Sequence, residues 1–272
     1  MKFDMNLAWR EASGMVSVNA QVLAIIAGVF FFLPSFAMAL FAPMPEATGT
    51  MDEAQAMNMV GTYYAEAAPW LIVVGIAQAI GVLALLALLT DRRRPTVGEA
   101  LKAGAVSFLP YFAAQLLLGV AVALGFVVIV GAATASGSVA LAAILFPLGF
   151  VGLVYVMTKT SLTAPVIVID GLRNPIRALS RSWNLTRGNS LRLFGFYFLV
   201  FLAFVVIMIV ISMIVGLISM IALGAGIVSQ IANGVLSGFA GALMVVYFVA
   251  IIASAHRQLS GPSPEAISQT FE

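Results

Sequence analysis

Five arginines and a tryptophan between residues 173 and 192 are the side chains in this sequence best suited to binding chemistry. They are Arg173, Arg177, Arg181, Trp183, Arg187 and Arg192. A guanidinium group is always charged, and its planar set of donors matches the oxygens of a phosphate group. A tryptophan beside such charges is typical of a segment held at the depth of lipid headgroups. These residues predict a surface that binds anionic lipid headgroups or a partner protein, and we expect no nucleic-acid partner.

Side chains for catalysis or metal binding are scarce in the sequence. It has no cysteine and a single histidine, His256, so thiolate chemistry is excluded and imidazole ligands are almost absent. No glycine-rich phosphate loop, nucleophile elbow or H-E-x-x-H pattern occurs. His256 stands beside Arg257, and we expect it to anchor a helix end at the membrane surface. The sequence predicts no catalytic residue, no metal site and no cofactor.

The elements that must position the arginines are membrane spans. Hydrophobic residues make up 62% of the 272 residues and charged residues only 9%, against about 25% charged in soluble domains. Stretches of roughly 20 apolar residues can cross a bilayer as helices. Six such stretches lack Asp, Glu, Lys and Arg: 18–42, 69–89, 105–133, 139–157, 193–223 and 229–255. We therefore expect an all-α, polytopic membrane protein with six transmembrane helices in a single membrane domain over residues 1–272.

The basic residues predict the orientation of these spans. All 13 Lys and Arg lie in the N-terminal tail, the loops at 91–104 and 158–192, and the C-terminal tail. The loops at 43–68, 134–138 and 224–228 have none. Basic residues favour the cytoplasmic side of a membrane. We expect both termini in the cytoplasm. Residues 22–33 also resemble the apolar part of a cleavable signal peptide, but the segment before them is long and contains Asp4 and Glu11, which favours a retained span.

A short amphipathic helix is predicted over residues 174–188, within the basic loop. Asn174 followed by proline is typical of a helix start, and Gly188 of a helix end. Ile176, Leu179 and Trp183 would form its apolar face, with the arginines on a neighbouring face. This pattern indicates a helix lying in the cytoplasmic interface. An alternative of equal weight is that the arginines only keep this loop on the cytoplasmic side of the membrane.

Weaker copies of the same arrangement precede the first and third spans. Residues 5–15 and 96–104 could each form a short interfacial helix before a two-span hairpin. The chain would then consist of three repeats of interfacial helix plus hairpin. Because the copies share few residues, this hypothesis concerns organisation only.

The last span carries small residues on one face, at Gly234, Gly238 and Gly241. Such residues let neighbouring helices approach closely. They predict helix packing within one chain, with a dimer interface as the alternative. Polar side chains inside the spans include Gln115, Gln230 and Asn233. We interpret them as hydrogen-bond partners between helices, with a substrate path as the alternative.

A family resemblance rests on about 30 residues, 163–192. Its motif is Ala164-Pro165-Val166-Ile167-Val168, then Asp170-Gly171, then the segment 178–189. This resembles the membrane domain found beside some bacterial glycerophosphoryl diester phosphodiesterases, and related stand-alone bacterial inner-membrane proteins. In those fusions a soluble barrel carries the enzyme. The longest loop here, 158–192, has 35 residues, whereas such a barrel needs about 250. The resemblance implies the membrane module without the enzyme, in a bacterial inner membrane.

Three function classes stand against each other. The first is a non-enzymatic scaffold or accessory subunit of other membrane proteins, whose basic rim contacts anionic lipid or a partner. The second is an uncoupled transporter, channel or lipid-moving protein, which a central cavity lined by Gln115, Gln230 or Asn233 would favour. The third is an enzyme on lipid headgroups, which needs a polar pocket facing Asp170 or Glu99. Because the spans carry no charged group, the first is favoured.

Overall fold

The computed structural model describes residues 2–42, 52–90, 95–218 and 227–261. All secondary structure in these ranges is helical, and six helices are long and apolar enough to cross a membrane. The chain is therefore an all-α polytopic protein, as its composition predicts. The elements are α1 Met5–Val18, α2 Ala20–Ala27, the π-helix η1 Gly28–Phe32, α3 Leu33–Phe41, α4 Glu53–Thr90, α5 Val97–Ser136, α6 Val139–Thr160, α7 Thr163–Val168, α8 Pro175–Leu185, α9 Ser190–Ile218 and α10 Ile227–Ser260.

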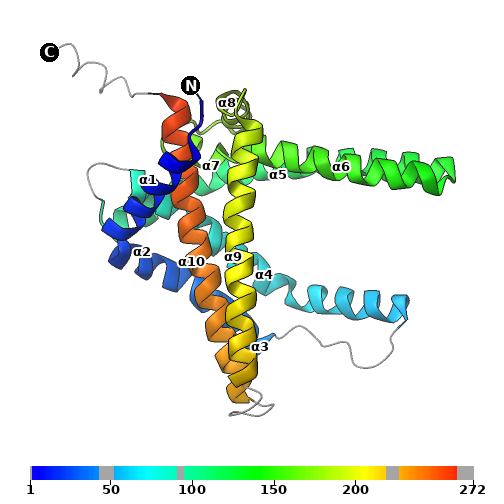
Figure 1. Cartoon of the computed structure of the whole chain (residues 1–272), viewed down its shortest axis with the longest axis horizontal. Coiled ribbons are helices and arrows are strands. Elements are labelled where there is room, and N and C mark those ends of the chain that lie inside the picture. The colour runs from blue at the N-terminus through cyan, green and yellow to red at the C-terminus, as the bar shows by residue number, and fades with distance from the viewer. Residues whose placement is uncertain (1, 43–51, 91–94, 219–226, 262–272) are drawn as a thin grey trace.

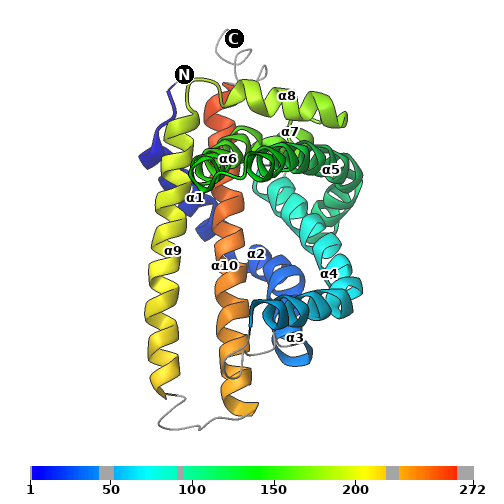
Figure 2. The same cartoon turned by 90° about the vertical axis from the view of Figure 1, so that its right-hand side faces the viewer.

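The helices diverge from one end of the molecule (Figure 1). The pair α9 and α10 runs in one direction, while the hairpin of α5 and α6 projects to the side. Seen from the side, α8 lies across the end of the molecule, next to α7 (Figure 2). Two hydrogen bonds join the start of the chain to the last turn of α10. The Asp4 N–H donates to Gln258 Oε1 at 3.1 Å, and Gln258 Nε2 donates to the Asp4 carbonyl at 3.3 Å.

The first span is a composite of α2, η1 and α3. Asn19, with φ −110° and ψ 13°, separates it from α1, and the π-helical turn follows at Gly28. A π-helical turn inserts extra backbone and reorients the side chains that follow. Phe31 within this turn is buried, so the irregular segment presents its aromatic side chain to the core.

Two spans extend beyond their predicted limits. Helix α4 begins at Glu53 and continues through Pro69, because neighbouring helices in a membrane can satisfy the backbone groups that a proline frees. Helix α5 begins at Val97, where Thr96 and Glu99 form a reciprocal capping box. The segment 96–104 is thus the first part of α5. The prediction of a separate interfacial helix there is wrong, and the three-repeat hypothesis loses its middle copy.

The tightest helix crossing joins α4 and α5 at Gly104. A Cβ atom at Gly104 would lie 2.7 Å from the Ile80 carbonyl oxygen and 2.9 Å from the Ala84 nitrogen. Backbone this close leaves no room for any side chain. Around this crossing lies a cluster of buried residues that includes Leu23, Ile26, Leu83, Leu85 and Leu86.

The glycines of α10 differ in their surroundings. At Gly238 a Cβ would lie 3.1 Å from the Phe32 ring, and at Gly234 it would lie 3.2 Å from both Ala39 and Phe36. These two glycines therefore pack against the first span of the same chain. Within the chain, the packing prediction for Gly241 is wrong: no described neighbouring atom lies within 4 Å of its Cβ position. Gly241 lies on another side of α10, whereas Ala242 beside it is buried in the core. The alternative of a dimer interface stays a prediction.

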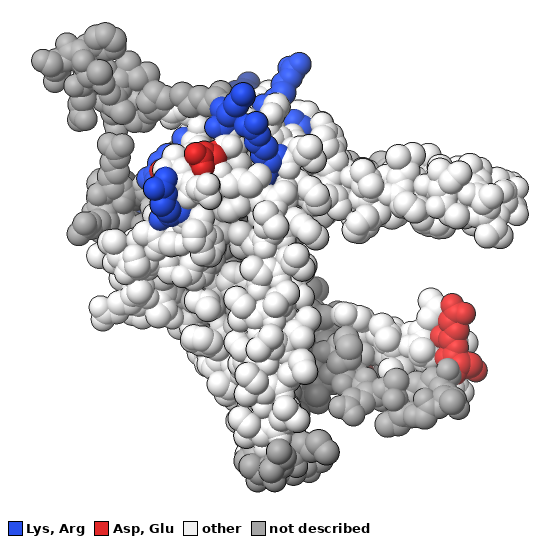
Figure 3. Space-filling model, in the orientation of Figure 1, with Lys and Arg blue, Asp and Glu red and all other residues white. Residues whose placement is uncertain are grey.

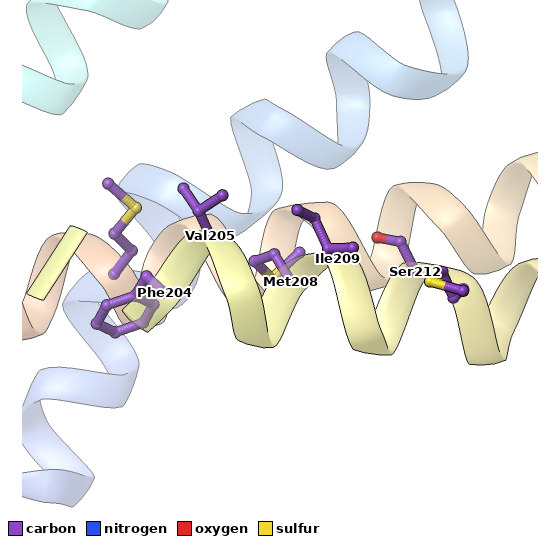
Figure 4. Close-up of a pocket in the computed structure, with 7 residues that line it drawn as sticks. Phe204, Val205, Met208, Ile209 and Ser212 are labelled. Atoms are coloured by element: carbon purple, nitrogen blue, oxygen red, sulfur yellow. The ribbon is translucent and has the colours of Figure 1, made fainter. Parts of the chain in front are cut away.

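The parts of α5, α6 and α9 far from α8 pack loosely. On α9 the described buried residues are Leu193, Phe196 and Val200, all in its first half. Farther along, an apolar gap of about 490 Å³ lies beside α10. Figure 4 shows the side chains along this gap, including Phe204, Met208 and Ser212 on α9. Such surfaces suit a hydrocarbon environment, because lipid chains replace the missing protein contacts.

Candidate functional site

The basic segment contains α8, with the predicted start. Asn174 is the N-cap, and its Oδ1 accepts a hydrogen bond from the Arg177 N–H at 3.0 Å. The proline that follows occupies the first helical position. The helix ends at Leu185, and a turn leads to Gly188, whose φ of +79° lies in the left-handed region that glycine adopts without strain. The prediction of a helix here is confirmed, with its end three residues earlier than predicted.

The face that α8 turns to the protein is made of small residues. Ala178 and Ser182 are fully buried against neighbouring elements, chiefly α7 and α5. Leu179 packs at the edge of this contact, whereas Ile176 is 67% exposed and Trp183 is 39% exposed. The predicted apolar face of Ile176, Leu179 and Trp183 is thus mostly turned away from the protein, where lipid can cover it. The small residues form the inner face because they let α8 lie close to α7.

Hydroxyl groups fasten α8 to the junction of α6 and α7. Ser182 Oγ donates to the Lys159 carbonyl at 2.9 Å and accepts from the Leu162 N–H at 3.2 Å. The Thr186 hydroxyl lies 3.4 Å from the same carbonyl. These groups at the end of α6 would otherwise lack backbone partners. Helix α8 therefore supplies the cap of α6 and is held in a fixed position by it.

Lys159 is a buried cation beneath α8. Its side chain is 3% exposed, and Nζ donates to the Trp183 carbonyl at 3.3 Å. The ammonium group lies 5.3 Å from the Trp183 ring centroid and 5.8 Å from that of Tyr155. Aromatic faces attract a desolvated cation at this range. From the sequence, Lys159 is expected to be a loop residue. In the structure it lies in the last turn of α6, and its side chain supports the Trp183 ring.

Asp170 joins α8 to α10. Its Oδ1 lies 3.1 Å from His256 Nε2, and its Oδ2 lies 3.5 Å from Arg181 Nε. The ring nitrogen is in ion-pair range without the alignment of a good hydrogen bond. Partial burial acts to raise the pKa of Asp170, but His256 and Arg181 together outweigh it and hold that pKa below its usual value. His256 is almost fully buried, so the prediction of an interfacial anchor is wrong.

The remaining arginines of the segment face outward. Arg173, Arg177, Arg187 and Arg192 are exposed. Within the described ranges no carboxylate lies in ion-pair distance of any of these four, whereas Arg181 shares Asp170 with His256. On the face shown in Figure 3, basic side chains gather at the α8 end with acidic atoms among them, and further acidic side chains lie at the tip of α4. The predicted site thus divides into one arginine paired with Asp170 and four with no carboxylate in ion-pair distance among the described residues.

Helix α1 completes the basic end of the molecule beside α10. Glu11 accepts a hydrogen bond from the Ser254 hydroxyl at 2.6 Å and pairs with Arg257 at 2.8 Å. The Phe3 N–H donates to Asn189 Oδ1 at 2.9 Å, next to the start of α9. These bonds connect residues more than 180 positions apart in the chain, and no local sequence pattern signals them.

The arrangement offers no assembled catalytic centre among the described residues. Ser254 is fully buried and donates to Glu11, which also pairs with Arg257, so its hydroxyl is closed to a substrate. The Glu99 side chain is engaged in the cap of α5. No cluster of three potential metal ligands occurs in the described part of the chain.

A cavity lined by Gln115, Gln230 or Asn233 is the feature that would favour a transporter. Gln115 lines a cavity of about 260 Å³ between α4, α5, α6, α7 and α10. Asn233 is exposed on α10 and does not line this cavity, and the side chain of Gln230 lies outside the described residues. One of the three amides therefore lines a cavity between the spans.

No family model matches this chain, and neither a curated protein nor a solved structure matches it. The site therefore rests on the geometry of its own residues. Of those residues, the sequence analysis did not anticipate the roles of Lys159, Ser182 and His256. Only the spacing of the small residues Ala178 and Ser182, four positions apart, could have indicated which face of α8 packs against the protein.

Proposed function

We propose that this chain is a non-enzymatic scaffold or accessory subunit of a membrane, whose basic rim binds anionic lipid headgroups. The observation that carries the proposal is the fixed position of α8, with Arg173 and Arg177 exposed on its outer side. The family resemblance of residues 163–192 supports the same proposal, since it implies a membrane module without an enzyme. By that resemblance, the membrane is a bacterial inner membrane.

Geometry at α8 favours lipid as the ligand. Arg173 immediately precedes the N-cap Asn174 and Arg177 lies in the first turn of α8, so both charges lie at the start of the helix. Ile176, between them, is 67% exposed and would enter the upper part of the hydrocarbon. Near an anionic surface each arginine contributes about 1 kcal/mol. Because the hydroxyl contacts already fix α8, binding orders little additional structure.

The orientation of the chain is part of the proposal. Basic residues at the α8 end favour the cytoplasmic side for that end and for both termini. Reporter fusions after residues 55 and 270 should therefore lie on opposite sides of the membrane. The same side for both fusions would contradict the orientation and the six spans together.

The lipid proposal is tested with a double variant, Arg173→Gln and Arg177→Gln. The protein is purified in lipid nanodiscs that contain phosphatidylglycerol and phosphatidylcholine, and the lipids retained after detergent exchange are measured by mass spectrometry. A matched control, Lys2→Gln with Arg10→Gln, removes the same charge from exposed positions near α1. We expect the α8 variant to retain several-fold less phosphatidylglycerol, and the control to resemble the unchanged protein.

Salt provides a second arm of this test. Exposed charges are screened within about 8 Å at physiological ionic strength, so higher salt should reduce phosphatidylglycerol retention in the unchanged protein to the level of the α8 variant. If the α8 variant retains as much phosphatidylglycerol as the control at every salt concentration, the arginines act only as orientation signals. If it instead loses a co-purifying protein, the ligand is a partner subunit.

A further inference from the structure

The cavity lined by Gln115 is an unusual place in an otherwise apolar interior. Its volume is about 260 Å³, just below the range of about 300–1,000 Å³ typical of sites for drug-sized ligands. Four of its lining residues carry hydroxyl or amide groups: Tyr111, Gln115, Thr160 and Ser161. Residues such as Leu86 and Val249 form the apolar remainder. One part of the cavity can therefore hold a polar group and the rest a hydrocarbon chain.

The polar groups of this cavity come from two elements. Tyr111 and Gln115 are one turn apart on α5 and so share one side of that helix. Thr160 ends α6, and Ser161 follows it directly. A tyrosine hydroxyl and a glutamine amide each offer both donors and acceptors. The cavity thus presents hydrogen-bonding groups from two walls.

The two hydroxyl groups at the end of α6 are left as acceptors. Thr160 Oγ1 donates to the Val156 carbonyl at 2.9 Å, and Ser161 Oγ donates to the Thr158 carbonyl at 2.8 Å. Each proton is therefore used within the chain. The Tyr197 hydroxyl lies 3.4 Å from Ser161 Oγ and takes one of its lone pairs, so a lone pair remains on Ser161 and two remain on Thr160. A ligand hydroxyl can donate to these oxygens and accept from Gln115 or Tyr111.

Charge selects the class of ligand. None of the residues that line the cavity is Lys, Arg, His, Asp or Glu. A charged headgroup would be desolvated there without a counter-ion, which is costly. A neutral hydroxyl-bearing group needs only the hydrogen bonds that the walls provide.

Access is possible from the surface of the spans. Met157, one of the lining residues, is 61% exposed, so the cavity meets the outer surface beside it. This surface belongs to α6, one of the six apolar helices. A lipid can therefore enter sideways, with its chain toward Met157.

We infer that this cavity binds the headgroup of a neutral, hydroxyl-bearing lipid with a single chain, of the monoacylglycerol class. The inference is separate from the proposed binding of anionic lipid at α8, because the two sites share no residue. It concerns a ligand held between the spans and not at the rim.

The test measures the thermal unfolding midpoint of the full chain in mild detergent with three probes. They are monolauroylglycerol, laurate at pH 8 and dodecylamine, which share a chain length and differ in headgroup charge. A ligand of the native state raises the midpoint saturably with its concentration. We expect monolauroylglycerol to do so with an apparent Kd at least tenfold lower than either charged probe. The variant Arg173→Gln with Arg177→Gln should keep this response, which separates it from the α8 site.

Two variants, each with a control variant, test whether the lipid binds in this cavity. Ala164→Leu fills the cavity and should abolish the saturable response, while Ala143→Leu on the exposed side of α6 should keep it. Gln115→Leu keeps the volume but removes the amide, and should raise the apparent Kd at least tenfold. Asn233→Leu, which removes an exposed amide, is its control. If Ala164→Leu does not fold, Gln115→Leu alone tests whether the lipid binds in this cavity.

Several results would overturn the inference. Without a saturable response to monolauroylglycerol, the cavity holds water only. Equal responses in the unchanged protein, Ala164→Leu and Gln115→Leu would place the lipid elsewhere. Equal affinity for the charged probes would contradict the selection by charge.

Discussion

The two ends of the spans are built differently. At the α8 end, polar and charged groups from α1, α6, α8 and α10 meet in pairs such as Glu11 with Arg257 and Asp170 with His256. At the far ends of α5, α6 and α9, the described side chains are mostly exposed and apolar. The first end is specified by contacts within the protein, whereas the second depends on the lipid around it. Substitutions should therefore have larger effects at the α8 end.

The largest effect is expected at Lys159. Lys159→Ala removes the side chain beneath Trp183 and leaves a void, along with the loss of the cation–π contacts. We expect a loss of about 2–4 kcal/mol in the free energy of unfolding. Lys102→Ala, at an exposed lysine of α5, should change little. Chemical denaturation in mild detergent measures both, and equal stabilities would show that α8 does not depend on the buried cation.

A smaller effect is expected at the crossing of α4 and α5. Gly104→Ala places a Cβ 2.7 Å from a backbone oxygen, so the helices must separate, at a cost of about 1–3 kcal/mol. Gly131→Ala, near the far end of the same helix, meets no described neighbouring atom within 4 Å and should be neutral or slightly stabilising. Thermal unfolding of the two variants compares the ends directly. A destabilised Gly131→Ala variant would show that the far end of α5 is also closely packed, contrary to the difference between the two ends.

The glycines of α10 compare two faces of that helix. Gly238→Leu must displace Phe32, whose ring and carbonyl lie 3.1 and 3.3 Å from the Cβ position. We expect a loss of about 1–2 kcal/mol in the free energy of unfolding. Gly241→Leu faces open space and should have little effect. If the two variants unfold at the same temperature, the face of Gly238 does not pack closely against the first span.

The smallest effect is the pH dependence contributed by Asp170. Its pKa is lowered in the folded protein from the ordinary value of 3.8, so folding favours the ionised carboxylate. This contribution is complete above about pH 4–5 and is lost as the pH falls through the lowered pKa. Asp170→Asn should therefore be less stable than the unchanged protein at pH 6, with a difference that shrinks below pH 4. A constant difference in stability from pH 3 to pH 6 would show that the ion pairs of Asp170 do not stabilise the fold.

Local patterns made the spans and α8 predictable. Runs of apolar residues define the six helices, and Asn174 followed by proline defines the start of α8 because a cap acts within three residues. The ends of α4 and α5 were harder to place. Polar residues before a span do not stop a helix when a cap such as Thr96 begins it earlier.

The polar contacts of the α8 end could not be predicted from such patterns. Asp170 and His256 are brought together by the fold, although α8, α9 and most of α10 lie between them in the sequence. In the sequence, Lys159 cannot be distinguished from an exposed loop lysine. It is buried because the fold places Trp183 over it. Likewise, the identity of the inner face of α8 depends on the space that α7 leaves, which amphipathic spacing does not encode.

The most direct test of the account is whether α8 touches anionic lipid. The sequence has three tryptophans, so Trp9→Phe with Trp70→Phe leaves Trp183 as the only reporter. Its fluorescence is measured in bilayers in which either phosphatidylglycerol or phosphatidylcholine carries brominated chains. We predict stronger quenching by brominated phosphatidylglycerol, and loss of this preference in high salt or after Arg173→Gln with Arg177→Gln. Equal quenching by the two lipids under all conditions would contradict the account.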